Sequence, residues 1–418
     1  MRLGKLAVSG LALAFAATCA AGDAAADDVA KLPRLATTNN SPEAEIVAQT
    51  GADAQSLKQI LPRIKLPMGF KIGLYAVVPG ARHMAIGPST GVVFVGTTDS
   101  KVWAVTDRNK DGVADEVKAF APAVDFVIPN GVCFAPDGAL YIAEQNRVLV
   151  FPIAESAYEN ADVPVFVVVQ QGGLIPVDEE SGGHSARVCR IGPDDRLYIA
   201  LGQPYNVAPP EKLDLYRTTG IGGIVRLDRD GQNREVYAWG IRNSVGMDFN
   251  PANGELWFTD NQVDRMGDDI PPGEINRATG PGQQFGFPWY GGGRVRTREY
   301  RNSAPPTDAV FPQVEEIAHA ADLGMTFYTG KMFPESYRGG IFSAQHGSWN
   351  RSAPVGARVM FTRLNADGSA TESTPFAEGW LDNATGDYLG RPVDVAQLPD
   401  GSLLVSDDTA GAVYRVWY

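Results

Sequence analysis

Short apolar runs separated by turn residues fill the chain from Gly69 to its end. Runs rich in Val, Ile, Tyr and Phe are broken by Gly, Pro, Asn and Asp about every ten residues, a texture typical of many antiparallel strands. Long helical periodicity is absent from this region, and one helix is expected before it, at residues 42–61. The pattern therefore predicts an all-β protein.

One unit recurs along this region: an apolar strand, a turn built on Pro-Asp-Gly or a relative of it, and a second apolar strand. Its copies occupy residues 86–95, 134–143, 191–200, 249–258, 398–406 and, in a degenerate form, 333–343. Successive turns lie about 50 to 85 residues apart, which leaves room for the four strands of a propeller blade and its loops. We therefore expect a six-bladed β-propeller, with a sandwich-like pairing of the same strands as the alternative.

A propeller must close its ring, because an open one leaves two exposed strand edges. The strand expected at residues 71–77 precedes the first repeat, and the chain ends in another apolar strand at residues 412–418. We expect the first of these strands to complete the blade that contains the last.

The first residues have the pattern of a secretory signal. Arg2 and Lys5 precede an apolar run, and small residues follow before Asp27. The run is shorter than the ~20 residues that a membrane-spanning helix needs, and nothing later in the chain replaces it. We therefore expect a cleaved signal at residues 1–26 and a periplasmic or secreted protein without a membrane span. Lipid attachment at Cys19 is the less favoured alternative, because Thr18 precedes it.

The remaining chain divides into an N-terminal extension at residues 27–66 and the propeller at residues 67–418. Its composition is that of an ordinary globular protein, with 44% hydrophobic and 20% charged residues. Acidic residues outnumber basic ones by 49 to 36, giving a formal net charge of −13. Such a surface does not suit a polyanionic partner, so nucleic acid and anionic membranes are not expected to bind.

Without the signal, the chain keeps only Cys133 and Cys189. Two cysteines are too few for a disulfide framework, and at most one bridge is possible. Each lies just before a predicted turn, so we expect small apolar core residues in preference to a disulfide. The absence of Cys-x-x-Cys-His excludes covalently attached haem.

Polar residues flank the repeats at the positions where propeller loops meet at one end of the central channel. Three Arg and two His side chains among them indicate an anionic ligand at the channel axis. The candidates are His184, Arg242, Asn243, Asn261, Gln262, His346, Trp349, Arg351 and Arg391.

These motifs together resemble those of the soluble quinoprotein glucose and sorbosone dehydrogenases. The most specific matches are Gly-His-Ser-Ala-Arg at residues 183–187, Gly-Ile-Arg-Asn at 240–243 followed by Asp-Asn-Gln at 260–262, and residues 268–276 with Phe-Gly-Phe-Pro at 285–288. The resemblance covers residues 69–418, and the L-sorbosone dehydrogenase branch looks closest. It implies a six-bladed propeller that binds pyrroloquinoline quinone (PQQ) and Ca²⁺.

The resemblance also implies roles for individual residues. His184 takes the place of the general base, and Arg242 with Asn243 that of the residues at the reactive edge of the quinone. Asn261 matches a glutamine that contacts the cofactor. The remaining matches are Gln262 and Val263 for the backbone carbonyls that hold the catalytic calcium, and Arg391 for the first of two arginines on the PQQ carboxylates.

The sequence departs from the glucose-oxidising branch at two positions. Val393 stands where the second arginine is expected, and His346 replaces a lysine, with Arg351 nearby as a substitute. These changes leave the quinone affinity and the substrate range open.

The implied chemistry is coherent on general grounds. A sugar hemiacetal or hydrated aldehyde releases hydride readily only as its hydroxyl proton leaves, and a neutral His184 can take that proton. The hydride needs an electrophile, which a quinone supplies, with Ca²⁺ polarising it and Arg242 stabilising the negative charge. We expect an aldose or sorbosone-like aldehyde as substrate and a separate electron acceptor, a cytochrome or a quinone. A calcium-dependent propeller lactonase and a cofactor-free binding propeller are the alternatives.

A separate motif has the spacing of a calcium-binding loop. Asp107, Asn109, Asp111 and Asp115 occupy its first, third, fifth and ninth positions, with glycine at the sixth. Lys118 stands where the bidentate glutamate belongs. We expect a structural Ca²⁺ here, far from the active end, with a metal-free turn as the alternative.

Overall fold

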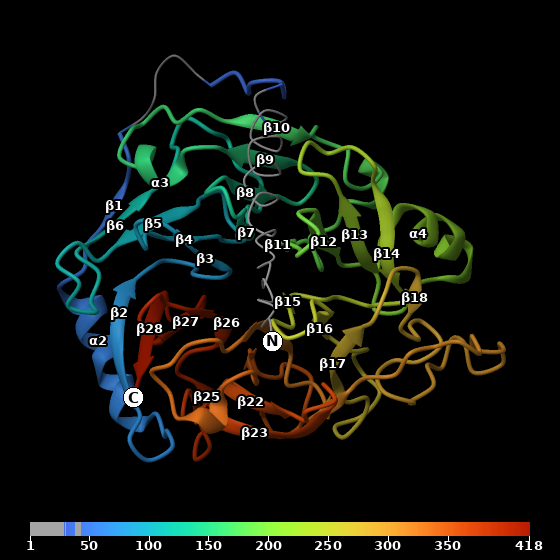
Figure 1. Cartoon of the computed structure of the whole chain (residues 1–418). Coiled ribbons are helices and arrows are strands. Elements are labelled where there is room, and N and C mark those ends of the chain that lie inside the picture. The colour runs from blue at the N-terminus through green and yellow to red at the C-terminus, as the bar shows by residue number, and fades with distance from the viewer. Residues whose placement is uncertain (1–28, 30, 38–42) are drawn as a thin grey trace, which may run out of the picture.

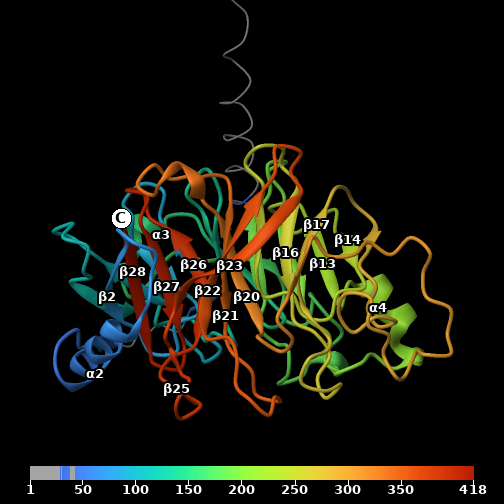
Figure 2. The same ribbon diagram turned by 90° about the horizontal axis from the view of Figure 1, so that it is seen from below.

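The computed structural model describes residue 29, residues 31–37 and residues 43–418. Its main strands form six sheets arranged as blades around a central channel (Figure 1), and the side view in Figure 2 shows them running between the two faces of a disc. The predicted six-bladed β-propeller is confirmed. From the channel outward, the first blade contains β3 (Met84–Ile86), β4 (Val93–Val95), β5 (Trp103–Thr106) and β6 (Glu116–Ala119), and the second contains β7 (Gly131–Phe134), β8 (Leu140–Ala143), β9 (Val148–Phe151) and β10 (Phe166–Val169). The third contains β11 (Val188–Ile191), β12 (Leu197–Leu201), β13 (Gly223–Leu227) and β14 (Glu235–Trp239), and the fourth contains β15 (Met247–Phe249), β16 (Leu256–Asp260), β17 (Gly273–Ala278) and β19 (Val314–Glu316). The fifth contains β20 (Asp322–Phe327), β21 (Ile341–Gln345), β22 (Arg358–Leu364) and β23 (Ala370–Glu378), and the sixth contains β26 (Pro392–Gln397), β27 (Leu403–Asp407), β28 (Ala412–Trp417) and β2 (Lys71–Val77).

The six innermost strands form a closed ring of contacts, in the order β3, β7, β11, β15, β20, β26 and back to β3. The closure expected from the sequence is confirmed, because β2 pairs antiparallel with β28 and completes the last blade. Strands such as β8 and β12 are buried along their whole length, since each blade is covered on both faces by its neighbours. The core therefore lies between the blades.

The turn in each repeat requires one residue with positive φ. Gly138 has φ 89° in the second copy, and Asp195 takes the same place in the third copy with φ 57°. Gly138 N–H donates to the Ala135 carbonyl at 2.9 Å, and Asp195 N–H donates to Gly192 at 3.0 Å. Asp is among the few residues that tolerate this backbone region, which explains how the repeat survives without its glycine.

The described part of the N-terminal extension runs along the outside of the propeller. Strand β1 (Ile46–Val47) adds to the edge of β6, and helix α2 (Ala52–Ile60) follows it. This helix is shorter than the one predicted at residues 42–61, because residues 46–47 pair as a strand instead. The predicted signal peptide and Cys19 lie outside the described residues, and the domain boundaries stay predictions.

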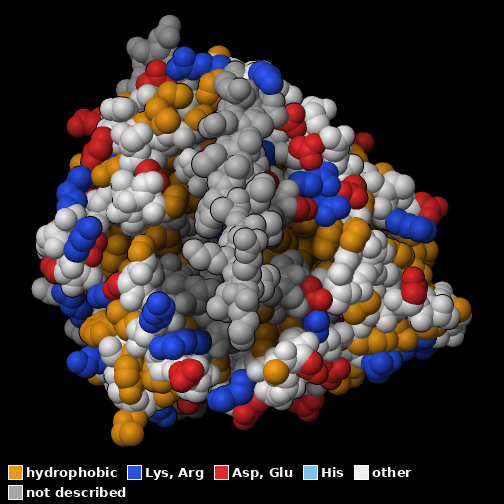
Figure 3. Space-filling model, viewed as in Figure 1, with side chains coloured by type: hydrophobic (Ala, Val, Ile, Leu, Met, Phe, Trp, Pro, Cys, Tyr) orange, Lys and Arg blue, Asp and Glu red, His pale blue; other side chains and the backbone are white. Residues whose placement is uncertain are grey.

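Outside the blades, the described chain holds short helices and small added strands. Helix α4 (Leu213–Thr219) is inserted between β12 and β13, and a long connection follows β18 (Gln283–Gln284), which pairs parallel with β14. Acidic and basic side chains are interspersed over the described part of the face seen in Figure 3. The remaining elements are α3 (Ala154–Ala157), η1 (Leu61–Arg63), η2 (Val177–Glu179), η3 (Pro210–Lys212), η4 (Glu335–Tyr337), β24 (Leu381–Asp382) and β25 (Asp387–Tyr388).

No helix among the described residues is long and apolar enough to cross a lipid bilayer.

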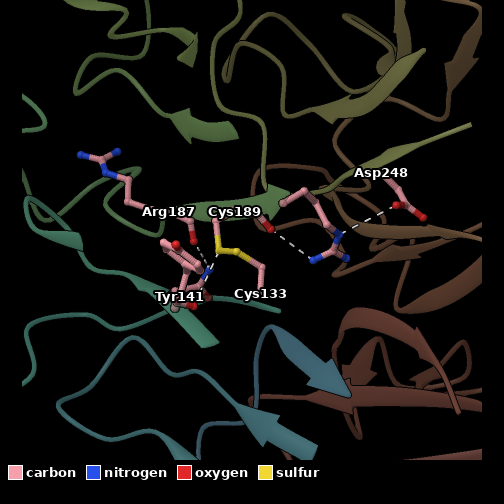
Figure 4. Close-up of a disulfide and its surroundings, with 7 residues drawn as sticks. Cys133, Tyr141, Arg187, Cys189 and Asp248 are labelled. Carbon is pink, nitrogen blue, oxygen red and sulfur yellow. Dashed lines mark hydrogen bonds and ion pairs between the residues drawn. A yellow bond between two sulfur atoms is a disulfide. The ribbon is translucent and has the colours of Figure 1, made fainter. Parts of the chain in front are cut away.

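Cys133 and Cys189 form a disulfide, which contradicts the prediction that they are separate core residues (Figure 4). They lie on β7 and β11, the innermost strands of neighbouring blades, and their Cα atoms are 5.8 Å apart. Blade stacking brings together two positions 56 residues apart in the chain. Spacing along the sequence does not reveal this proximity.

We expect loss of this disulfide to destabilise the propeller. A closed loop of this length constrains the unfolded chain, so the Cys133→Ala/Cys189→Ala variant should lose about 2–4 kcal/mol of unfolding free energy. Guanidinium unfolding of the variant and the wild-type protein, with and without a thiol reductant, measures the difference. The variant should not respond to the reductant; equal stability of the oxidised wild-type protein and the variant would contradict the prediction.

Candidate active site

The propeller topology gathers the candidate residues at one end of the channel. Each innermost strand pairs antiparallel with the second strand of its blade, as Val188 with Ala200 and Met247 with Phe258. The residues before the first strand and after the second therefore lie at the same edge of every blade. Polar residues at these two positions in different blades converge, although they are far apart in the sequence.

A cavity of about 330 Å³ lies where these loops meet. Seven of the residues singled out from the sequence line it: His184, Arg242, Asn243, Asn261, Gln262, His346 and Trp349. They come from the third, fourth and fifth blades. The sequence thus placed most of the candidate polar residues in one cavity.

Three predicted residues near this end of the channel do not line the cavity. Arg391 donates from Nε and Nη2 to the carbonyls of His346 and Gly347, at 2.9 and 2.6 Å. Arg351 donates to the backbone of Asp268 and Ala318. Val263 is buried. Their predicted contacts with cofactor or metal stay predictions, and the contacts present show Arg391 and Arg351 holding loops beside the cavity.

His184 is held by a backbone carbonyl. Its Nδ1 lies 2.6 Å from the carbonyl oxygen of Gln203. A carbonyl only accepts hydrogen bonds, so Nδ1 carries the proton and Nε2 keeps its lone pair. Burial, and then the charge of Arg242, lower the pKa of His184 to about 4. The imidazole is therefore neutral near pH 7 and can accept a proton at Nε2.

This environment predicts how His184 titrates. Its proton affinity should be so weak that the ring stays neutral from pH 8 down to pH 5, because protonation begins only near its pKa of about 4. NMR of protein with ¹³C-labelled histidine measures this, with a His184→Asn variant to assign the signal. A His184 resonance that shifts with a midpoint near the ordinary value of about 6.5 would contradict the prediction.

Arg242 is fixed by a network of acceptors on two loops. Its Nε donates to the Asn206 carbonyl at 2.9 Å, and Nη2 contacts Asn206 Oδ1 and Asp264 Oδ2 at 2.9 and 3.0 Å. The Arg242 and Asn243 backbone N–H groups donate to the two carboxylate oxygens of Asp260, at 2.9 and 2.7 Å. Arg242 is only 3% exposed, so its side chain has little room to change conformation. Arg242 is a preorganised positive charge at the cavity wall.

The structure adds residues that the sequence reasoning missed. Arg82 lines the cavity and forms an ion pair with Asp408, whose second oxygen accepts from His346 Nε2 at 2.8 Å. Although burial opposes it, the hydrogen bond from His346 and the nearby charges hold the pKa of Asp408 below its usual range. Arg82 precedes the first repeat and Asp408 follows the last. They occupy the same positions next to the repeats as the residues singled out in other blades. A search for polar residues at these positions in every blade could therefore have found them.

Several buried polar atoms at the cavity have no partner among the described residues. They are Asn243 Oδ1, Asp322 Oδ2 and Asn350 Oδ1, and their three residues line the cavity. Unsatisfied buried polar groups are costly, so this cavity is built to be completed by a polar ligand.

The predicted calcium loop lies between β5 and β6, at the end of its blade opposite the cavity. Its Asn109 Oδ1 and Asp111 Oδ1 accept from backbone N–H groups within the loop, each at 2.9 Å, and Asp107 and Asp115 also accept loop N–H groups. No three His, Cys, Asp or Glu side chains in the described chain are placed to hold a metal ion. Calcium at this loop stays a prediction without support from the geometry.

Solved structures with the same fold include several sugar dehydrogenases. The chain is similar to a Trichoderma reesei enzyme of carbohydrate-active family AA12, with TM-score 0.71 and 20% identity over 85% of this chain and 98% of that one. The PQQ domain of pyranose dehydrogenase from Coprinopsis cinerea gives a TM-score of 0.69 with 18% identity, over 85% and 97% of the two chains. At these identities the likeness concerns the fold alone.

Sequence comparisons extend to proteins of several bacteria. An uncharacterised protein of Borreliella burgdorferi is 32% identical over 372 residues, which cover 86% of this chain and 92% of that protein. The aldose sugar dehydrogenase YliI of Escherichia coli is 27% identical over 240 residues, 53% of this chain and 56% of that protein. The model of the family named glucose/sorbosone dehydrogenase matches residues 176–415. These residues carry most of the cavity described above, and the chain belongs to the glucose/sorbosone dehydrogenase family.

Proposed function

We propose that this protein is a periplasmic PQQ-dependent dehydrogenase that oxidises an aldose or a sugar aldehyde. The observation that carries the proposal is the neutral, carbonyl-bound His184 beside the fixed Arg242 in one polar cavity. A general base and a preorganised positive charge are the two groups that hydride abstraction from a sugar hydroxyl carbon requires. Membership of the family supports the same reaction class.

The cavity fits a planar, anionic cofactor. The Oδ1 atoms of Asn243 and Asn350, which have no partner among the described residues, can accept N–H or O–H groups of a ligand. Arg82 and Arg242 supply positive charge and hydrogen-bond donors at the cavity wall. PQQ carries three carboxylates and quinone oxygens, which such groups bind. When bound, it supplies the electrophile that no side chain offers.

His184 takes the proton of the reacting hydroxyl in this proposal. The Gln203 carbonyl fixes the ring orientation through Nδ1, which leaves Nε2 as the accepting atom. Because the ring is neutral at working pH, no proton has to leave it before substrate binds. The low pKa is set by burial and by Arg242, so the two residues work as a pair.

Arg242 stabilises negative charge as it develops near the reacting centre. Its ion pair with Asp264 and its bonds to Asn206 hold the guanidinium in place before substrate arrives. A fixed donor costs no reorganisation during the reaction, and its loss typically lowers kcat by about 10²- to 10³-fold. Ca²⁺ bound by the Gln262 and Val263 carbonyls remains part of the proposal, on the resemblance alone.

A direct experiment tests the proposed function. Cofactor-free protein is mixed with PQQ and Ca²⁺, and the absorbance spectrum is recorded before and after addition of single aldoses. We expect micromolar binding and reduction of the bound quinone by at least one sugar. Absence of binding at micromolar quinone, or no reduction by any aldose or sugar aldehyde, would contradict the proposal.

A further inference from the structure

A second cavity, of about 270 Å³, lies beside the active site, between helix α4, the end of β14 and the segment 287–289. Its walls are mainly apolar and aromatic. They include Leu213 and Tyr216 of α4, Trp239 and Ile241 at the end of β14, and Phe287 with Trp289 opposite them. The volume lies just below the range of ~300–1,000 Å³ that drug-sized ligands occupy, so it suits a ligand of one ring.

The two cavities share one wall, which is built around Gln203. The carbonyl of Gln203 holds His184 Nδ1 at 2.6 Å, and its N–H donates to the Arg242 carbonyl at 3.2 Å. Gln203 also lines the second cavity, as does Ile241, the neighbour of Arg242 in the chain. A ligand in the second cavity is therefore separated from the two proposed catalytic residues by a single layer of backbone.

The chemistry of the wall does not suit a sugar. The Gln203 amide is already satisfied, because Oε1 accepts from Tyr205 N–H at 3.1 Å and Nε2 donates to the Tyr205 carbonyl. A sugar has a hydroxyl on almost every carbon, and the free polar groups of this wall, on Asp214, Arg217 and Trp289, are too few to pair with all of them. An apolar planar ring has no such hydrogen bonds to lose, and it gains contact with the faces of the aromatic side chains.

The polar groups that remain are mostly donors. The Arg217 guanidinium lies 5.2 Å from the centre of the Trp239 ring. Neither it nor the Trp289 indole N–H makes a hydrogen bond within the described residues. A quinone ring needs apolar contact on its faces and donors for its two carbonyl oxygens, which matches this set. Asp214 also lines the cavity; its carboxylate is exposed and only accepts hydrogen bonds.

We propose that this second cavity, named here the Trp239–Trp289 pocket, binds a benzoquinone-type electron acceptor. The inference rests on the proposed function. Oxidation of a sugar hemiacetal to its lactone releases two electrons and two protons. A benzoquinone takes up two electrons and two protons to become a hydroquinone, so the overall reaction balances. Because Gln203 separates the two cavities, an acceptor bound in the Trp239–Trp289 pocket lies next to the site where the sugar is oxidised.

The binding test uses tetramethylbenzoquinone, which is fully substituted and therefore does not add readily to lysine or thiol groups. Isothermal titration calorimetry of the cofactor-free full chain should show one site with micromolar affinity. Leu213→Trp, which fills the Trp239–Trp289 pocket, should weaken binding at least tenfold. Thr218→Trp is the matched control, because Thr218 is exposed on the same helix and does not line the pocket. Trp289→Leu provides a second variant if Leu213→Trp fails to fold.

The kinetic test uses protein loaded with PQQ and Ca²⁺. The KM for tetramethylbenzoquinone should rise at least tenfold in Leu213→Trp or Trp289→Leu and stay at the wild-type value in Thr218→Trp. Absence of saturable binding, or equal affinity in the pocket variants and the control, would overturn the inference. Sugar oxidation with ferricyanide but no quinone binding would contradict this inference alone, whereas quinone binding without reduction of PQQ by any sugar would contradict the proposed function alone.

Discussion

Replacing His184 by alanine is expected to lower kcat by about 10²- to 10⁴-fold, the usual contribution of a general base. The Nε2 lone pair, left free because Nδ1 donates to the Gln203 carbonyl, is the proposed acceptor of the hydroxyl proton. Binding of PQQ should remain within a few-fold of the wild-type value, since Arg82, Arg242 and His346 are unchanged. Steady-state turnover with the best aldose and a separate PQQ titration measure the two quantities.

The backbone at His184 calls for a second variant. His184 has φ 54°, a conformation that disfavours alanine but that asparagine tolerates. His184→Asn removes the base without adding this strain, so it should lose as much turnover as the alanine variant. The matched control is His319→Asn, because His319 also lines the cavity and has φ 65°, but its Nε2 contacts the Gly267 and Ile270 carbonyls. Unchanged turnover in His184→Asn would remove His184 from the catalytic role.

Replacing Arg242 is expected to lower kcat by about 10²- to 10³-fold even when PQQ saturates. The interaction of its guanidinium strengthens as negative charge grows in the transition state, so its loss raises the barrier more than it weakens ground-state binding. Arg242→Met keeps much of the apolar volume of the side chain. Half-saturation by PQQ and the maximal rate, measured on the same preparation, separate the two effects. Loss of affinity alone would place Arg242 outside the catalytic machinery.

Arg391→Ala is the matched comparison. Arg391 holds the loop of His346 through two carbonyls instead of lining the cavity. The resemblance places Arg391 on a PQQ carboxylate, and such a charge-assisted hydrogen bond contributes about 1.5 to 3 kcal/mol. Its loss should therefore weaken PQQ binding about 10- to 150-fold while the maximal rate survives. Asp264→Asn removes the ion pair that helps to orient Arg242, and its effect should fall mainly on kcat. Identical patterns in Arg242→Met and Arg391→Ala would contradict the division of roles.

The propeller could be predicted because its signals are local. The turn of each repeat depends on neighbouring residues, as Gly138 and Asp195 show by taking positive φ at the same repeat position. Strand alternation and turn spacing then predict the number of blades, and edge pairing predicts how the ring closes through β2 and β28. The same phase along the repeat placed His184 and Arg242 at one end of the channel.

Contacts between blades depend on stacking, and local pattern carries no information about it. The Cys133–Cys189 disulfide joins neighbouring blades, and the ion pair of Arg82 with Asp408 joins the first blade to the last. The sequence by itself determined the repeat, the blade count and most of the polar residues at the channel mouth, because each depends on residues close together in the chain. Only the tertiary structure decided the pairing of the cysteines and which atom of His184 is free, because these depend on side-chain distances set by how the blades pack.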